Sequence, residues 1–68
     1  MTNTKLLREK IEASGLKLQY IADQLGITRF GLYKKLQDGS EFKPSQIVIL
    51  CDILKIETIE ERAQIFLI

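Results

Sequence analysis

Apolar residues recur at helical spacing in five stretches of the chain, and glycines or polar residues separate these stretches. The clearest stripe consists of Leu18, Ile21, Ala22 and Leu25, whose i, i+3, i+4, i+7 spacing is typical of a helix with one buried face. The pattern predicts an all-α fold, a small five-helix domain that covers residues 1–68. We expect the helices over residues 5–14, 18–25, 29–37, 44–54 and 59–66.

Capping residues indicate where these helices begin. Thr4 and Thr28 are suited to the N-cap position, and Pro44 is suited to the first turn, where its missing N–H is not needed. Thr58 followed by Glu61 predicts a capping box, in which the Thr58 hydroxyl accepts from the Glu61 amide and the Glu61 carboxylate reaches back to the Thr58 amide. On the last helix, we expect Ile59, Ala63 and Phe66 to face inward.

The 68 residues offer little chemistry for catalysis or metal binding. Cys51 is the only cysteine and the chain has no histidine, which excludes an internal disulfide and the usual zinc ligands. Without a histidine to act as base, Cys51 is expected to be a small apolar residue on the inward face of the fourth helix. We therefore expect no enzyme, no cofactor, no metal and no small-molecule substrate. No apolar run approaches the ~20 residues that span a bilayer, so we expect a cytoplasmic protein without membrane contact.

The second and third predicted helices are joined only by Gly26, Ile27 and Thr28. Two helices connected by such a short turn form a rigid corner, and the second helix can enter the major groove of DNA. Gly26 can adopt a positive φ, and the small Ala22 lets the two helices approach closely. The net charge of +1 is low for a DNA-binding protein, yet residues 1–45 carry eight Lys and Arg against five Asp and Glu. Any phosphate-binding surface is therefore expected in this first part.

The segment LKLQYIADQLGITRFGLYKKLQDG, residues 16–39, resembles the Cro/repressor-type (XRE-like) helix-turn-helix family, in which an Ala and a turn Gly stand where Ala22 and Gly26 stand here. More narrowly, GLYKKLQDGSEFKPSQI and the ending ERAQIFLI resemble the modulator-of-repression proteins of temperate phages of Gram-positive bacteria. This resemblance implies a phage repressor-like fold and a regulator of the lysis/lysogeny switch in the bacterial host cell. It implies repression by binding operator DNA, capture of the phage repressor protein, or both.

The third helix presents the candidate recognition face, because its outer side chains lie opposite Leu32 and Leu36. In a DNA complex, Arg29, Tyr33 and Gln37 would read bases, and lysines would meet phosphates. In a protein complex, Phe30 and Tyr33 would act as apolar anchors. Phe30 and Leu18 replace the polar residues that the family commonly uses on DNA, although Leu18 also fits the buried stripe. The candidate DNA- or partner-binding residues are Gln19, Thr28, Arg29, Phe30, Tyr33, Lys34, Lys35, Gln37 and Lys43.

The last two predicted helices contain more apolar side chains than one buried face requires. These side chains form a possible homodimer or partner surface, because helix-turn-helix proteins commonly bind as dimers. Alternatively, several of them complete the core of the monomer. The residues concerned are Val48, Ile49, Ile53, Ile65, Leu67 and Ile68.

Overall fold

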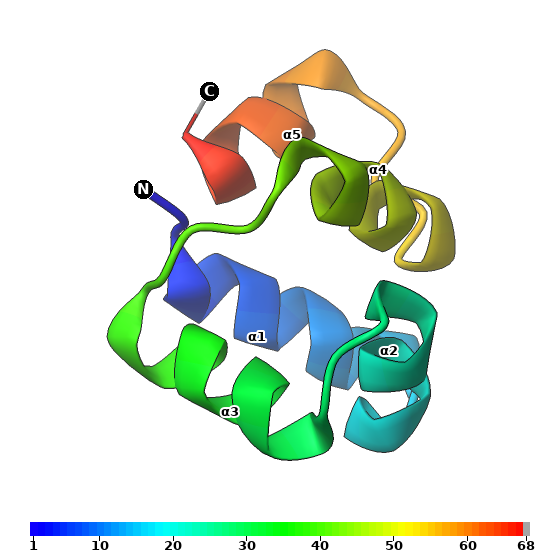
Figure 1. The fold of residues 1–68 in the computed structure, drawn as a ribbon. Coiled ribbons are helices and arrows are strands. Elements are labelled where there is room, and N and C mark those ends of the chain that lie inside the picture. The colour runs from blue at the N-terminus through cyan, green and yellow to red at the C-terminus, as the bar shows by residue number, and fades with distance from the viewer. Residues whose placement is uncertain (68) are drawn as a thin grey trace.

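The computed structural model describes residues 1–67 and consists of five α-helices joined by short connections (Figure 1). No strand occurs in this described part of the chain. The prediction of an all-α, five-helix fold is confirmed, and the observed helix bounds differ from the predicted ones by a residue at several ends. The helices are α1 Thr4–Ser14, α2 Leu18–Leu25, α3 Arg29–Asp38, α4 Pro44–Ile53 and α5 Ile59–Phe66.

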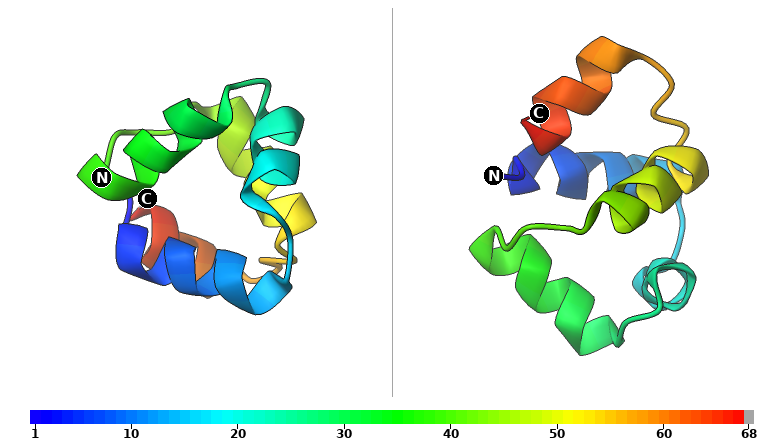
Figure 2. Two further views of the ribbon diagram at one scale, coloured as in Figure 1. Left: turned by 90° about the horizontal axis from the view of Figure 1, so that it is seen from below. Right: turned by 45° about the horizontal axis from the view of Figure 1, so that its top comes forward.

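The helices surround one apolar core, with α1 between α3 on one side and α5 on the other (Figure 2). Helix α2 packs against both α3 and α4. The predicted stripes supply the centre of this core, because the side chains of Leu7, Ile21, Leu32 and Leu50 are completely buried. Burial of such side chains is the main favourable contribution to folding. Ala22 is also fully buried, as expected for a small residue between closely packed helices.

The turn between α2 and α3 has the predicted geometry. Gly26 ends α2 with a φ of +71°, in the left-handed region that side chains with a Cβ rarely adopt. Thr28 then caps α3, because its hydroxyl accepts a hydrogen bond of 2.9 Å from the Gly31 amide. The two helices therefore form a corner whose ends are fixed by a glycine and a side-chain cap.

Two of the predicted caps are wrong in detail. Helix α1 is capped by Asn3, whose Oδ1 accepts from the Leu6 amide at 3.2 Å, and Thr4 is already the first helical residue. At α5, the Thr58 hydroxyl accepts from the Glu61 amide at 3.1 Å as predicted. The Glu61 carboxylate, however, pairs with Lys10 Nζ at 3.0 Å. Helix α5 packs on α1, so the carboxylate has a cationic partner within reach and does not return to the cap.

The inward face of α5 also differs from the predicted one. Ile59 is 82% exposed, whereas Ile65 and Phe66 are buried and the Phe66 ring meets the Phe42 ring edge-on at 6.5 Å. This short helix contacts the core through its last turn, so its first turn projects into solvent. The prediction that Ile59 faces inward is wrong.

Helix α4 buries a polar side chain that the sequence pattern did not indicate. Gln46 is buried, and its Oε1 accepts a hydrogen bond from the Lys43 backbone amide at 2.9 Å. This bond satisfies both the buried side-chain acceptor and a backbone N–H at the start of the helix. Leu50 and Leu54 are buried as predicted, while Ile47 and Cys51 are only half-buried. None of the helices within residues 1–67 has the length and apolar character needed to cross a bilayer.

Candidate functional site

The outer face of α3 carries two large exposed rings. Phe30 is 70% exposed and Tyr33 is 52% exposed, whereas Leu32 and Leu36 on the opposite side are buried. Arg29 and Gln37 lie on the same outer face and are also exposed. The predicted exposure of this face is therefore confirmed.

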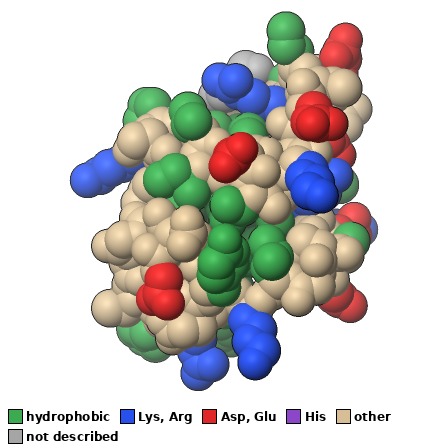
Figure 3. Space-filling view, turned by 90° about the vertical axis from the view of Figure 1, so that its right-hand side faces the viewer, with side chains coloured by type: hydrophobic (Ala, Val, Ile, Leu, Met, Phe, Trp, Pro, Cys, Tyr) green, Lys and Arg blue, Asp and Glu red, His purple; other side chains and the backbone are tan. Residues whose placement is uncertain are grey.

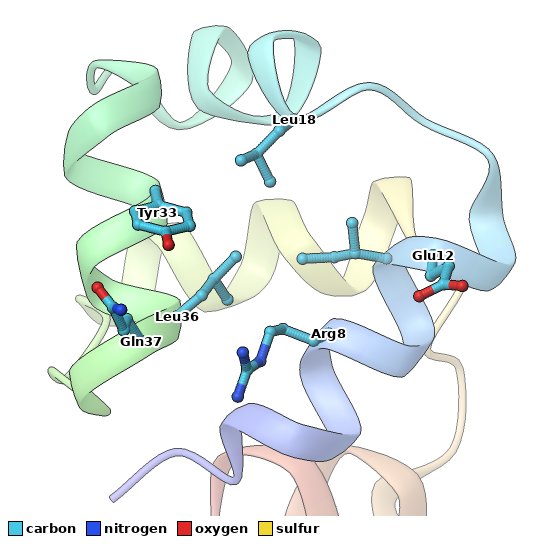
Figure 4. Close-up of a pocket in the computed structure, with 7 residues that line it drawn as sticks. Arg8, Glu12, Leu18, Tyr33, Leu36 and Gln37 are labelled. Atoms are coloured by element: carbon cyan, nitrogen blue, oxygen red, sulfur yellow. The ribbon is translucent and has the colours of Figure 1, made fainter.

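A groove runs beside these rings. Its first part, about 310 Å³, lies between the start of α2 and the start of α3, where Leu18, Arg29, Phe30 and Tyr33 line it. Its second part, about 280 Å³, lies between α1 and α3 and shares Leu18 and Tyr33 with the first (Figure 4). We call the two parts together the α3 groove. The second part is lined by Arg8, Ile11, Glu12, Leu18, Tyr33, Leu36 and Gln37.

Leu18 has both of the roles that the sequence left open. Its side chain packs against the core, and it also forms part of the surface of the α3 groove. Figure 4 shows Leu18 pointing from the start of α2 into the space between α1 and α3. An apolar side chain at this position makes the groove suitable for an apolar ligand group and leaves no side-chain donor there for a phosphate.

The three lysines predicted to hold phosphates lie in three different environments. Lys35 Nζ donates to the carbonyl oxygen of Glu41 at 2.9 Å and lies 5.4 Å from the centre of the Phe42 ring, so its charge is held at the connection to α4. Lys34 Nζ lies 6.0 Å from the centre of the Phe30 ring. Lys43 is exposed at the N-cap of α4. Lys35 is therefore directed away from the outer face of α3, contrary to the expectation for a phosphate contact.

Gln19 and Thr28, the other predicted site residues near the turn, are exposed and hydrogen-bonded within their own helices. Gln19 Nε2 donates to Asp23 Oδ1 at 2.8 Å, one turn further along α2. Thr28 caps α3 as described above. Thr28 therefore has a structural role at the corner, and Gln19 has one within α2.

A negatively charged side chain, Asp38, lies at the C-terminal end of α3. The Ser40 hydroxyl and backbone amide donate to Asp38 Oδ1 at 2.6 and 3.0 Å, and these hydrogen bonds hold the pKa of the Asp38 carboxyl below its usual range. The ionised carboxylate is exposed beside Gln37. The outer face of α3 is therefore mixed in charge.

Two site residues come from α1 and were not predicted. Arg8 and Glu12 line the second part of the α3 groove, and Figure 4 shows the Arg8 side chain extending toward α3, where Gln37 and Tyr33 lie. The available signal was their spacing of four residues, which places both on one side of α1, next to the inward Ile11. That spacing alone does not tell which neighbouring helix they face.

The residues proposed as a second surface do not share one environment. Val48 and Leu67 are exposed, Ile49 and Ile53 are half-buried against the core, and Ile65 is only 3% exposed. Ile65 belongs to the core, because the last turn of α5 packs inward. Ile68 lies outside the described residues. Apolar side chains gather in the middle of the face that carries α2 and the end of α4 (Figure 3). The exposed large apolar residues of these two helices are Tyr20 and Val48.

Within residues 1–67, no three His, Cys, Asp or Glu side chains come together as a metal site would require. No family model, curated protein or solved structure matches the chain.

Proposed function

We propose that this chain is a small helix-turn-helix regulator of a phage lysis/lysogeny switch, and that it acts by binding the phage repressor through the α3 groove. The proposal rests mainly on one observation, the exposure of Phe30 and Tyr33 beside an apolar groove. The resemblance of residues 16–39 to Cro/repressor-type regulators supplies the biological setting. Binding at this face would counteract the repressor or act together with it at operator DNA.

The chemistry of the groove favours a protein partner. Large aromatic side chains beside an open apolar groove are typical of binding hot spots, because they bury much area at little cost in conformational entropy. One of the lysines predicted to meet phosphates is less available than the sequence indicated, since Lys35 donates to the Glu41 carbonyl, while Lys34 and Lys43 are exposed. The two large exposed rings of Phe30 and Tyr33 are therefore the main features of α3 that a protein partner could bury.

Direct binding of operator DNA is the second candidate. It is supported by the exposed Arg29 and Gln37 on the outer face of α3. Arg29 could donate two hydrogen bonds to guanine, and Gln37 could pair with adenine. Tyr33, between them along the helix, would then contact the DNA backbone or a base.

A gel-shift and co-purification experiment tests the proposal. Operator DNA is mixed with this protein alone, with the phage repressor alone, and with both proteins. We expect the repressor–DNA band to change when both are present, and we expect Phe30→Ala and Tyr33→Ala each to weaken capture of the repressor by about 2 kcal/mol or more. Ile59→Ala is the matched control, because it removes an exposed apolar side chain of α5 that lines neither part of the α3 groove.

The same experiment can contradict the proposal. If Phe30→Ala and Tyr33→Ala capture the repressor as well as the unmodified protein does, the α3 groove is not the interface. A shifted band with this protein and operator DNA alone would establish direct DNA binding as the mechanism, provided that the affinity for the DNA falls steeply between low and physiological salt.

A further inference from the structure

Arg8 is a cation that forms no ion pair within residues 1–67 and lines the α3 groove beside apolar side chains. The two ion pairs found within residues 1–67 join the Met1 amine to Glu41 and Lys10 to Glu61, so neither of them involves Arg8. The Arg8 side chain extends from α1 toward α3, where Gln37 and Tyr33 line the same part of the groove (Figure 4). The Arg8 guanidinium and the Gln37 side chain are thus two polar groups that line one part of the groove from two different helices.

We infer that Arg8 and Gln37 form a carboxylate-binding subsite at this end of the α3 groove, and that the partner inserts an amphipathic segment with an acidic residue close to apolar ones. The inference rests on the proposed function, because it specifies what the partner must present to the groove. Arginine suits this role, since its planar fork can donate two parallel hydrogen bonds to one carboxylate.

The walls of the groove explain why the acid must be accompanied by apolar side chains. Ile11, Leu18 and Leu36 line the same part of the groove as Arg8. An apolar side chain of the partner that covers them would exclude water from the Arg8 guanidinium, and a charge pair is stronger where water is excluded. The carboxylate and the apolar contact therefore reinforce one another.

Glu12 distinguishes a protein carboxylate from the phosphates of a nucleic acid. Glu12 lies one helical turn from Arg8 on α1 and lines the same part of the groove. A duplex carries a phosphate charge about every 1.7 Å along its axis, so phosphates on Arg8 would also approach the Glu12 carboxylate. A protein segment can place a single acid at Arg8 and a neutral or basic residue opposite Glu12. The charges of the groove therefore favour a protein.

The test measures the affinity of the full chain for the purified phage repressor. Arg8→Ala is expected to weaken binding roughly tenfold or more, as is typical when a hydrogen-bonded charge loses its partner in a covered interface. Arg8→Lys keeps the charge without the fork and should lie between Arg8→Ala and the unmodified protein. Lys5→Ala removes the same charge from the same helix outside the groove, and it should leave the affinity unchanged.

The outcomes separate this inference from the proposed function. If Phe30→Ala weakens repressor binding and Arg8→Ala does not, the subsite is refuted while the α3 groove stands as the interface. If neither substitution has an effect, the groove itself is not the interface and both proposals fall. If Arg8→Ala weakens binding to an operator duplex and lowers its salt dependence, but leaves repressor binding unchanged, the anion is a phosphate and the inference is overturned.

Discussion

Lys35 Nζ lies 2.9 Å from the carbonyl oxygen of Glu41 and 5.4 Å from the centre of the Phe42 ring. The side chain thereby joins α3 to the segment that leads into α4. Phe42 is buried and its ring meets the Phe66 ring of α5 edge-on, so the contact connects α3 to the core. Lys35 consequently stabilises the position of α3 and does not take part in its outer face.

Replacing Lys35 by Met tests this structural role. The variant keeps an apolar stem over Phe42 and loses the ammonium group, so we expect the free energy of unfolding to fall by about 1 kcal/mol. Urea denaturation measures the change, and Lys34→Met serves as control because Lys34 only approaches the ring of its neighbour Phe30. Equal losses in the two variants would show that the Glu41 contact contributes nothing specific.

The start of α1 permits a paired test of its cap. Asn3→Ala removes the oxygen that accepts from the Leu6 amide, and we expect it to lower stability by about 1 kcal/mol. Thr4→Ala alters the neighbouring residue inside the helix and should change stability by less than about 0.5 kcal/mol. Thermal or urea unfolding of both variants gives the comparison. A larger loss for Thr4→Ala would restore Thr4 as the cap.

The two isoleucines of α5 should respond very differently to truncation. Ile65 is 3% exposed, so Ile65→Ala leaves a cavity and is expected to cost about 2–5 kcal/mol. Ile59 is 82% exposed, so Ile59→Ala should stay within about 0.5 kcal/mol of the unmodified protein. Similar losses at both positions would mean that α5 packs through a different face.

Cys51 makes stability depend on alkaline pH. Partial burial raises the pKa of its thiol above the ordinary value, so the folded chain holds this proton more firmly than the unfolded chain does. The contribution of this thiol to the free energy of unfolding is therefore fully present below the thiol pKa of the unfolded chain. It is lost as the pH rises through the higher pKa of the folded chain.

Unfolding measured through this range for the protein and for Cys51→Ala isolates the effect of the thiol. We expect the stability of the protein relative to Cys51→Ala to fall as the pH rises, and the thiol to react with an aromatic disulfide reagent more slowly in the folded chain than in urea. A difference between the two proteins that is independent of pH would contradict the assignment.

Local patterns were sufficient to predict most of the fold. The stripe of Ile21, Ala22 and Leu25 and the glycine that follows it define α2 without reference to other helices. The cap of α1 was misplaced by one residue, and the errors at α5 occurred where a residue depends on helices distant in the sequence. Glu61 pairs with Lys10, which is 51 positions away in the chain, and no periodicity within α5 reveals that contact.

The candidate site was predictable to the same extent. The outer face of α3 follows from its own helical period, so the exposure of Phe30 and Tyr33 was predicted correctly. The contribution of Arg8 and Glu12 depends on how α1 lies against α3, which is a property of the packed structure. For the same reason, the direction of the Lys35 side chain could not be predicted, because it depends on the position of the Glu41 carbonyl in the loop after α3.

The backbone amide of Asn3 donates to the carbonyl oxygen of Ile65 at 2.6 Å, which draws the first residues of the chain against the last turn of α5. Helix α5 lies on the side of α1 opposite α3 (Figure 1). The Met1 amine pairs with Glu41 at 2.9 Å, so a tether at the start of the chain would leave beside the loop that follows α3, at the end of that helix opposite Phe30. The protein can be immobilised through that tether on a sensor surface with Phe30 and Tyr33 still open to a partner in solution.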